Sequence, residues 1–117
     1  MTKNVSIVIV TWNSEDEISE CLRGIFLNPD NKYFDNIEAI VIDNASEDNT
    51  VNTVRSYQKL IDGDLKLIEN EDNLGFTRGA NLGLHQAKYE TVMILNPDTE
   101  IFENSLELLH KKLYSDN

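Results

Sequence analysis

Four short apolar runs, separated by stretches with helical periodicity, organise this chain. Residues 5–10 are rich in β-branched side chains and almost entirely apolar, which is typical of a strand buried on both faces of a parallel sheet. Similar runs at 37–42, 65–68 and 91–95 predict three more strands. Because all four runs are far shorter than a bilayer is thick, the pattern predicts no membrane span.

Between the strands, apolar residues recur at helical spacing. Ser14 and Glu17 form a capping-box pattern that predicts the start of a first helix, and the breaker sequence at 28–31 ends it. Ser46 is the expected cap of a second helix, and Thr77 is the expected start of a third. The stripes expected on these helices are Ile18, Cys21, Leu22 and Ile25, then Val51, Val54 and Ile61, then Ala80, Leu84 and Ala87, and on a last helix Leu106, Leu109 and Leu113.

The alternation of strands and helices predicts an α/β fold. We expect one three-layer α/β/α domain over residues 1–117, with a mostly parallel, doubly wound sheet in the strand order 3-2-1-4. Gly75, Gly79 and Gly83 recur every four residues near the third helix, which predicts that its backbone packs closely on the sheet.

In such sheets ligands bind beyond the carboxyl ends of the strands, where the strand order reverses. With the order 3-2-1-4, the first and fourth strands flank that point. The residues that leave the strands there are Thr11, Trp12 and Asn13 after the first, Asp43 and Asn44 after the second, and Asn96 and Asp98 after the fourth. We therefore expect these three sets to converge.

The net charge of the chain limits the classes of molecule that it can bind. Lys and Arg number 10 against 21 Asp and Glu, which gives a net charge of −11. Such a chain repels nucleic acid and anionic lipid surfaces, so we expect no nucleic-acid partner. The single cysteine, Cys21, excludes an internal disulfide and a Cys-rich zinc site, and the apolar run near the start is too short for a signal peptide. These features predict a reduced, cytoplasmic, soluble domain.

The N-terminus of a helix attracts a phosphate unless acidic side chains already occupy its first turn. Acidic residues at 15–17 and 47–48 occupy the first two expected helix starts, which argues against a Rossmann, flavodoxin-type or P-loop site. The third start, 73–80, contains no acid and one cation, Arg78. Arg78 is either a phosphate ligand or a solvent-exposed residue of the first turn.

Four other residues also have two interpretations. Asp98, with Asn96 and Glu100 beside it, offers oxygen ligands of the kind that Mg²⁺ or Mn²⁺ takes together with substrate phosphates, or it is a turn residue. Trp12 either stacks on a nucleobase or packs in the core. Asp43 and its neighbour Asn44 either bind base or ribose edges or lead into the second helix.

Five ordered motifs together resemble the opening of family 2 glycosyltransferases with the GT-A fold. The motifs read VSIVIVTWN at 5–13, VIDNASEDNT at 41–50, NEDNLGF at 70–76, RGANLG at 78–83 and LNPDT at 95–99. They span nearly the whole chain. The Asp-Asn-Ala-Ser and Asn-Pro-Asp sequences are most similar to those of the rhamnosyltransferase-like branch. The last motif stands where this family carries a metal-binding Asp-x-Asp motif.

The resemblance implies a donor site formed by Thr11, Trp12, Asn13, Asp43, Asn44, Arg78 and Asn96, with Asp98 as the metal ligand. By this resemblance Trp12 lies against the base, and Thr11 adds backbone contacts. Asp43 and Asn44 address the pyrimidine and ribose, and Arg78 lies near the base or diphosphate. Asp98 coordinates Mg²⁺ or Mn²⁺ between the two phosphates.

Two departures from the family pattern matter. Asn96 replaces the first Asp of the Asp-x-Asp motif, so the protein supplies less negative charge to the metal. The acceptor-binding half of the family, with its general base, normally follows this motif, and neither Glu103 nor Glu107 can be assigned as that base. We therefore expect a domain truncated before the acceptor half, or a chain that works with another polypeptide.

The expected function is transfer of a sugar from a UDP- or dTDP-linked donor to an unknown acceptor, with inversion, in cell-wall or polysaccharide biosynthesis. The full-length protein would be cytoplasmic, with peripheral contact at the inner face of the membrane. The alternative is a non-catalytic nucleotide-sugar-binding or interaction module. A receiver-like domain would need acids where Thr11, Trp12 and Asn13 stand, and a nucleotidyltransferase would need a basic, Gly-rich loop there.

Overall fold

Strands and helices alternate along the part of the chain that the computed structural model describes, which is residues 3–28, 33–99, 107 and 110–112. The elements are β1 (Asn4–Thr11), α1 (Glu15–Phe26), β2 (Asn36–Asp43), α2 (Thr50–Leu60), β3 (Asp64–Glu69), α3 (Gly75–Gln86) and β4 (Val92–Leu95). Of the last expected helix, Leu106, Leu109 and Leu113 lie outside the described residues, whereas residues 107 and 110–112 are helical.

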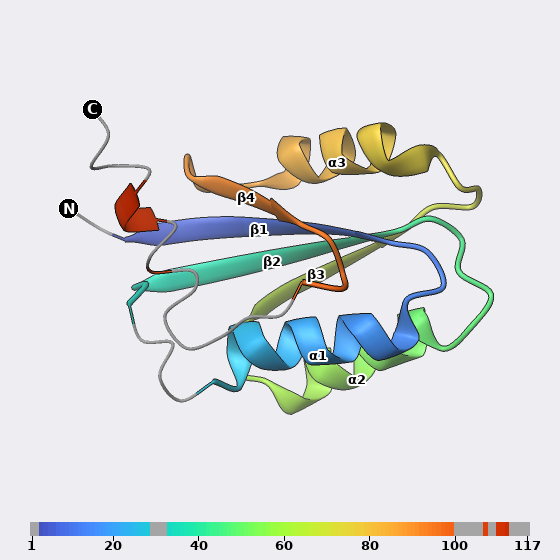
Figure 1. Cartoon of the computed structure of the whole chain (residues 1–117), viewed down its shortest axis with the longest axis horizontal. Helices are drawn as coiled ribbons and strands as arrows, with labels where there is room; N and C mark the ends of the chain where they lie inside the picture. Colours follow the sequence, from blue (N-terminus) through green and yellow to red (C-terminus); the bar gives the residue numbers. More distant parts are fainter. Residues whose placement is uncertain (1–2, 29–32, 100–106, 108–109, 113–117) are drawn as a thin grey trace.

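The four strands form one parallel sheet in the order β3-β2-β1-β4. Helices α1 and α2 cover one face of this sheet and α3 covers the other, which makes three layers (Figure 1). The predicted fold class and strand order are therefore confirmed. The order reverses between β1 and β4, so the two strands flank a switch point.

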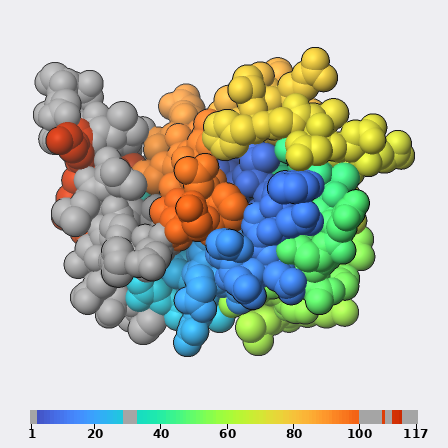
Figure 2. Space-filling model, turned by 45° about the vertical axis from the view of Figure 1, so that its right-hand side comes forward, coloured from blue at the N-terminus to red at the C-terminus, as the bar shows by residue number. Residues whose placement is uncertain are grey.

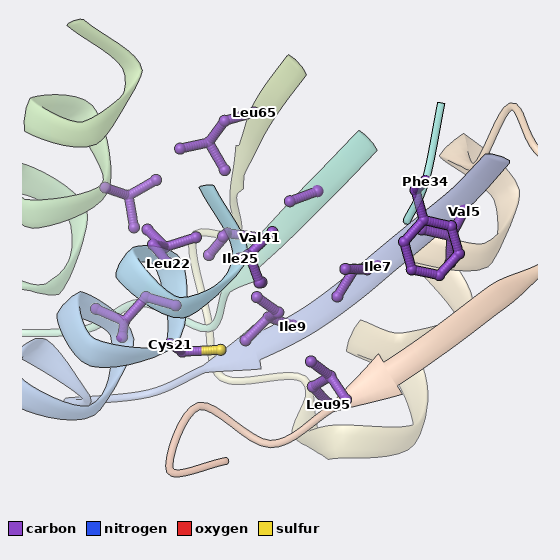
Figure 3. Packing of buried hydrophobic residues seen from close by; sticks show 13 residues of the cluster. Val5, Ile7, Ile9, Cys21, Leu22, Ile25, Phe34, Val41, Leu65 and Leu95 are labelled. Carbon is purple, nitrogen blue, oxygen red and sulfur yellow. The ribbon is translucent and has the colours of Figure 1, made fainter. Parts of the chain in front are cut away.

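Alternate side chains of the central strands fill two separate cores. Ile7 and Ile9 of β1 face α1, where they pack with the buried Cys21 and Leu22 (Figure 3). Val8 and Val10 face α3 and pack with Ile40, Ile42 and Ala80. The stripe predicted for the first helix, Ile18, Cys21, Leu22 and Ile25, is fully buried as expected. Burial raises the pKa of the Cys21 thiol to about 12, with a smaller contribution from the charge of Asp98.

The first helix begins directly after Ser14 as predicted, but the predicted capping bond is absent, and the predicted start of the second helix is wrong. Ser14 precedes α1, but its hydroxyl makes no capping bond and instead bonds the backbone of Trp12. The second helix begins at Thr50 rather than directly after Ser46, because Ser46 is held in a turn by Asp43. The capping pattern failed in both cases because each hydroxyl bonds a residue that precedes it, Trp12 or Asp43, instead of the start of the helix.

Helix α3 begins at Gly75, two residues before its predicted start, and approaches the sheet closely, as the glycine spacing predicted. A Cβ atom built on Gly79 would lie 2.9 Å from Cγ1 of Val10, and one on Gly83 would lie 2.3 Å from Cγ1 of Val8. Leu84 was expected on the apolar side of this helix, but it is 42% exposed. With two glycines against the strands, the sheet-facing side of α3 is narrow and leaves Leu84 on its flank.

Candidate functional site

The segments that leave β1, β2 and β4 come together at the carboxyl edge of the sheet. Thr11 pairs with Asp43 at the ends of β1 and β2, and Leu95 ends β4 beside Ile9. Figure 2 shows the segments after β1 (blue), β2 (green) and β4 (orange) on one face of the molecule. The expected convergence of the three sets is thus present in the fold.

Trp12 is the most exposed aromatic ring at this edge. Its relative exposure is 55%, and it directly follows β1. The alternative in which Trp12 packs in the core is therefore wrong. Asn96 and Asp98, beyond β4, are also exposed.

Asp43 lies just inside the edge and is almost completely buried. Its Oδ1 atom accepts hydrogen bonds from the hydroxyls of Thr11 at 2.7 Å and Ser46 at 2.6 Å. Its Oδ2 atom accepts one bond, from the Ser46 N–H at 2.9 Å. Since a carboxylate oxygen can accept two bonds, Oδ2 retains capacity for a further donor.

Asn44 is turned toward the chain's own loop. Its amide nitrogen donates to the Gly75 carbonyl at 3.1 Å, and its Oδ1 accepts from Asn70 at 2.9 Å and from the Leu74 N–H at 3.4 Å. Asn44 is 2% exposed. These contacts hold the loop before α3, so Asn44 acts on the site through that loop. The buried Thr11 hydroxyl is likewise directed at Asp43.

Two non-glycine residues at this edge adopt left-handed backbone conformations. Asn13 has φ 47° and Ala45 has φ 62°. Asn tolerates this region, whereas Ala at such an angle costs roughly 1–2 kcal/mol. The strain thus gathers in the two loops that leave β1 and β2, where functional sites often keep it.

The Asp48 carboxylate accepts hydrogen bonds from residues at the starts of two helices. It accepts hydrogen bonds from the N–H and hydroxyl of Thr50, at the start of α2, and from the N–H of Glu15, at the start of α1. Burial acts to raise the pKa of Asp48, but these hydrogen bonds outweigh it and hold the pKa below its ordinary value. Both helix starts are therefore occupied by the protein's own carboxylates, as expected, although α2 has no acid in its first turn.

The start of α3 is different. Gly75, with φ 82°, leads into a first turn that contains no acidic residue. Arg78 is exposed in that turn. The structure therefore leaves Arg78 accessible to a ligand, as both interpretations of it require.

An acidic hollow lies between α1 and the segment after β4. Its volume is about 280 Å³, and it is lined by Asp16, Glu17, Glu20, Pro97, Asp98 and Thr99. No group of three His, Cys, Asp or Glu side chains in the described part of the chain is arranged to hold a metal ion by itself. Mg²⁺ and Mn²⁺ take one or two carboxylates together with substrate phosphates, so Asp98 fits as a protein ligand that needs the donor to complete the shell.

Of the two carboxylates considered as a general base, only Glu107 is among the described residues. Glu107 accepts an ion pair from Lys111 at 2.9 Å. Its side chain is 26% exposed. Glu103 lies outside the described residues.

Sequence reasoning missed the role of Ser46, which bonds both Asp43 and the loop after β1. The signal that could have found it is the spacing Asp-x-x-Ser directly after a strand. An Asp side chain in that position commonly accepts bonds from the backbone that follows it.

Comparison with known proteins agrees with this geometry. The family model described as "Glycosyl transferase family 2" matches residues 6–117. Glycosyltransferase GlyG of Streptococcus pneumoniae is 26% identical over 97% of this chain and 36% of its own length. In the residues that the structure describes, no helix is both long enough and apolar enough to cross a membrane.

Two solved structures share the fold. One is S. aureus TarS 1-349 in complex with UDP-GlcNAc, with a TM-score of 0.74, 26% identity, and coverage of 98% of this chain and 32% of that chain. The other is the mannosyltransferase PcManGT from Pyrobaculum calidifontis in complex with GDP-Man and Mn²⁺, with a TM-score of 0.77, 28% identity, and coverage of 91% of this chain and 31% of that chain. The chain spans about a third of the length of these proteins. On the family match, the fold and these relatives, the chain belongs to the family 2 glycosyltransferases.

Proposed function

We propose that this chain binds a UDP- or dTDP-linked sugar together with Mg²⁺ or Mn²⁺, as the donor-binding part of an inverting glycosyltransferase. The observation that carries the proposal is the convergence of Trp12, Asp43 and Asp98 at the carboxyl edge of the sheet. A nucleotide sugar needs a surface for its base, a partner for the base edge and charge compensation for its diphosphate. This edge offers one group for each.

The base would lie against the exposed ring of Trp12. Asp43 has room for one more hydrogen bond at Oδ2, and a carboxylate can only accept. It therefore favours a base whose ring nitrogen carries a hydrogen, as in uracil and thymine. Cytosine presents an acceptor at the same place. In this arrangement Thr11, Asn13 and Asn44 shape the pocket from within.

The diphosphate would lie toward the segment after β4. Asp98 and the Asn96 amide would hold the divalent cation against the phosphates, and the acidic hollow would attract it. When bound, the cation supplies charge neutralisation for the departing diphosphate. Arg78, exposed and without acids around it in its turn, would approach the base or diphosphate from α3.

The acceptor site would come from residues beyond this donor-binding part, since the chain spans about a third of the relatives that it matches. There a base would take the proton of the acceptor hydroxyl, whose oxygen would bond to the anomeric carbon from the side opposite the leaving diphosphate. With a net charge of −11, any peripheral contact of the full-length cytoplasmic protein with an anionic membrane would also lie outside this part. The proposal extends to a role in cell-wall or polysaccharide biosynthesis.

Calorimetry on the full chain tests the proposal. UDP and dTDP should bind saturably in Mn²⁺ or Mg²⁺ and much more weakly in EDTA, whereas CDP should bind less well than UDP. ADP serves as the control for unspecific attraction of a diphosphate to the metal. Equal binding of all four nucleotides, or binding that ignores the metal, would show that this edge is not a donor site of the proposed kind.

A further inference from the structure

The loops that leave β1 and β2 are tied to each other through one hydroxyl. The Asn13 N–H donates to the Ser46 Oγ at 2.8 Å, and the same Oγ donates to Asp43 Oδ1 at 2.6 Å. Ser46 thus links the loop that carries Trp12 to the carboxylate of Asp43. In the described part of the chain, two side chains bond the Asp43 carboxylate, Thr11 and Ser46. Of these two, Ser46 also bonds the loop after β1.

A second tie runs in the opposite direction. The Oδ1 atom of Asn13 accepts a hydrogen bond from the Glu47 N–H at 2.8 Å. Both ties lie at the left-handed residues, because Asn13 takes part in each of them and Ala45 directly precedes Ser46. Strained backbone of this kind persists only where the surrounding contacts hold it. Here the contacts that hold it are the two ties.

We propose that Ser46 is a positioning residue for the nucleotide base, which fixes the Trp12 loop and the Asp43 carboxylate as one unit. This inference rests on the proposed donor site. Ser46 need not touch the ligand: its hydroxyl keeps Asp43 oriented, and its bond to Asn13 keeps the ring of Trp12 at a fixed distance from that carboxylate. Trp12 can then stack on a base while Asp43 bonds the edge of the same base. Because the two loops are already ordered, binding does not cost the entropy of ordering them.

The substitution Ser46→Ala removes the hydroxyl bond to Asp43 and the acceptor for Asn13, while it keeps the Ser46 N–H bond. We expect the affinity for UDP in Mn²⁺ to fall by about tenfold, since one part-buried and one exposed hydrogen bond are lost. The affinity for CDP should fall less, because cytosine uses the stacking on Trp12 but not the bond to Asp43, so the UDP:CDP ratio should also fall. A merely structural role would lower both affinities alike and leave the ratio unchanged.

Two variants act as controls. Ser46→Thr keeps the hydroxyl and should restore the UDP:CDP ratio to within about twofold of the parent. Ser56→Ala removes an exposed hydroxyl on α2 that bonds only its own helix, and should leave both affinities unchanged. If Ser46→Ala does not fold, Ser46→Cys replaces it, because a thiol is a weaker donor and acceptor at the same position. For Ser46→Cys we expect a fall in the ratio of about threefold.

The outcomes separate the two proposals. A parent chain that binds no nucleotide, or binds UDP and CDP equally, removes the donor site itself. A parent that prefers UDP, with a Ser46→Ala variant that keeps the same preference, overturns the positioning role alone. The same holds if Ser46→Thr behaves like Ser46→Ala, because then the hydroxyl is not what matters.

Discussion

Ser6 on β1 and Glu38 on β2 are neighbours in the sheet, and the Ser6 hydroxyl donates a 2.8 Å hydrogen bond to the fully buried Glu38 carboxylate. Lys66 on β3 donates to the other carboxylate oxygen at 2.8 Å, and the Lys88 N–H after α3 donates at 3.1 Å. One carboxylate therefore joins three strands and the connection into β4. It lies far from the carboxyl edge, so its role is in stability.

We expect Glu38→Gln to lower the free energy of unfolding by about 2 kcal/mol at neutral pH, because the amide loses the charge-assisted bonds. Burial acts to raise the pKa of Glu38, but the bonds from Lys66, Lys88 and Ser6 outweigh it and hold the pKa below its ordinary value of 4.5. A lowered pKa means that the stabilisation is present above 4.5 and is lost as the pH falls through the folded-state value.

Urea unfolding followed by circular dichroism between neutral pH and about pH 3 measures this difference. The gap between the parent and Glu38→Gln should narrow as the pH falls below about 4.5. The exposed Glu90→Gln serves as the matched control and should show no gap. A gap of constant size at every pH would mean that the carboxylate's charge contributes nothing.

The close approach of α3 to β1 gives a second prediction. In an open helix Gly→Ala gains about 1 kcal/mol, whereas overpacking a core costs about 1–3 kcal/mol. At Gly83 the new Cβ would lie 2.3 Å from Cγ1 of Val8, so the clash should exceed the gain. We expect Gly83→Ala to lower the melting temperature.

The exposed Asn81→Ala, on the same helix, is the control and should leave the melting temperature equal or higher. Val8→Ala in the Gly83→Ala background removes the clashing methyl groups. The double variant should therefore lose less stability than the sum of the two single variants. Strict additivity would show that the helix simply moves away from the sheet.

The parts of the fold that the sequence predicted are those set by local pattern. Continuous β-branched runs are enough to place β1 and β2, and the order of elements then limits the sheet topology. The stripe of α1 was also correct because Ile18, Cys21, Leu22 and Ile25 are large and regularly spaced. In α3 the sheet-facing residues are Gly79, Ala80 and Gly83, and Leu84 was misplaced because the two glycines carry no apolar signal.

The edge residues were found but their contacts were not. Position after a strand predicted that Trp12, Asp43 and Asn44 would gather, because the topology alone dictates it. That Asn44 turns toward Asn70 and Gly75, and that Ser46 accepts a bond from Asn13, depends on hydrogen bonds between residues of separate loops. No local propensity encodes such partners, so the sequence could not separate a ligand-facing side chain from one that holds a loop.

Asp98 gives a prediction on the metal. Because it is exposed, Asp98→Ala should leave the melting temperature nearly unchanged. It should weaken UDP binding in Mn²⁺ by about 1.5–3 kcal/mol, the range for a lost charged contact. Calorimetry in Mn²⁺ and in EDTA measures the effect, and the exposed Asp62→Ala is the control. An unchanged affinity would make Asp98 a turn residue only.

Trp12 is the only tryptophan of the chain, which makes the base surface directly observable. Its ring is 55% exposed, so its emission should be that of a solvated indole. Stacking of a base on an aromatic ring is worth roughly 1–3 kcal/mol in nucleic-acid sites. We therefore expect UDP or dTDP with Mg²⁺ to change the fluorescence saturably, and Trp12→Ala to lose affinity while its melting temperature stays the same.

Manganese can quench indole emission by itself, so a titration with each metal alone is the necessary control. A second control is Phe76→Ala, since Phe76 is 52% exposed at the start of α3 and tests whether any exposed aromatic side chain there has the same effect on binding. If the ring bears the base, the fluorescence change and the calorimetric titration must give the same dissociation constant. A saturable calorimetric signal with unchanged emission, and a Trp12→Ala variant that binds like the parent, would place the base elsewhere at the edge, away from the ring.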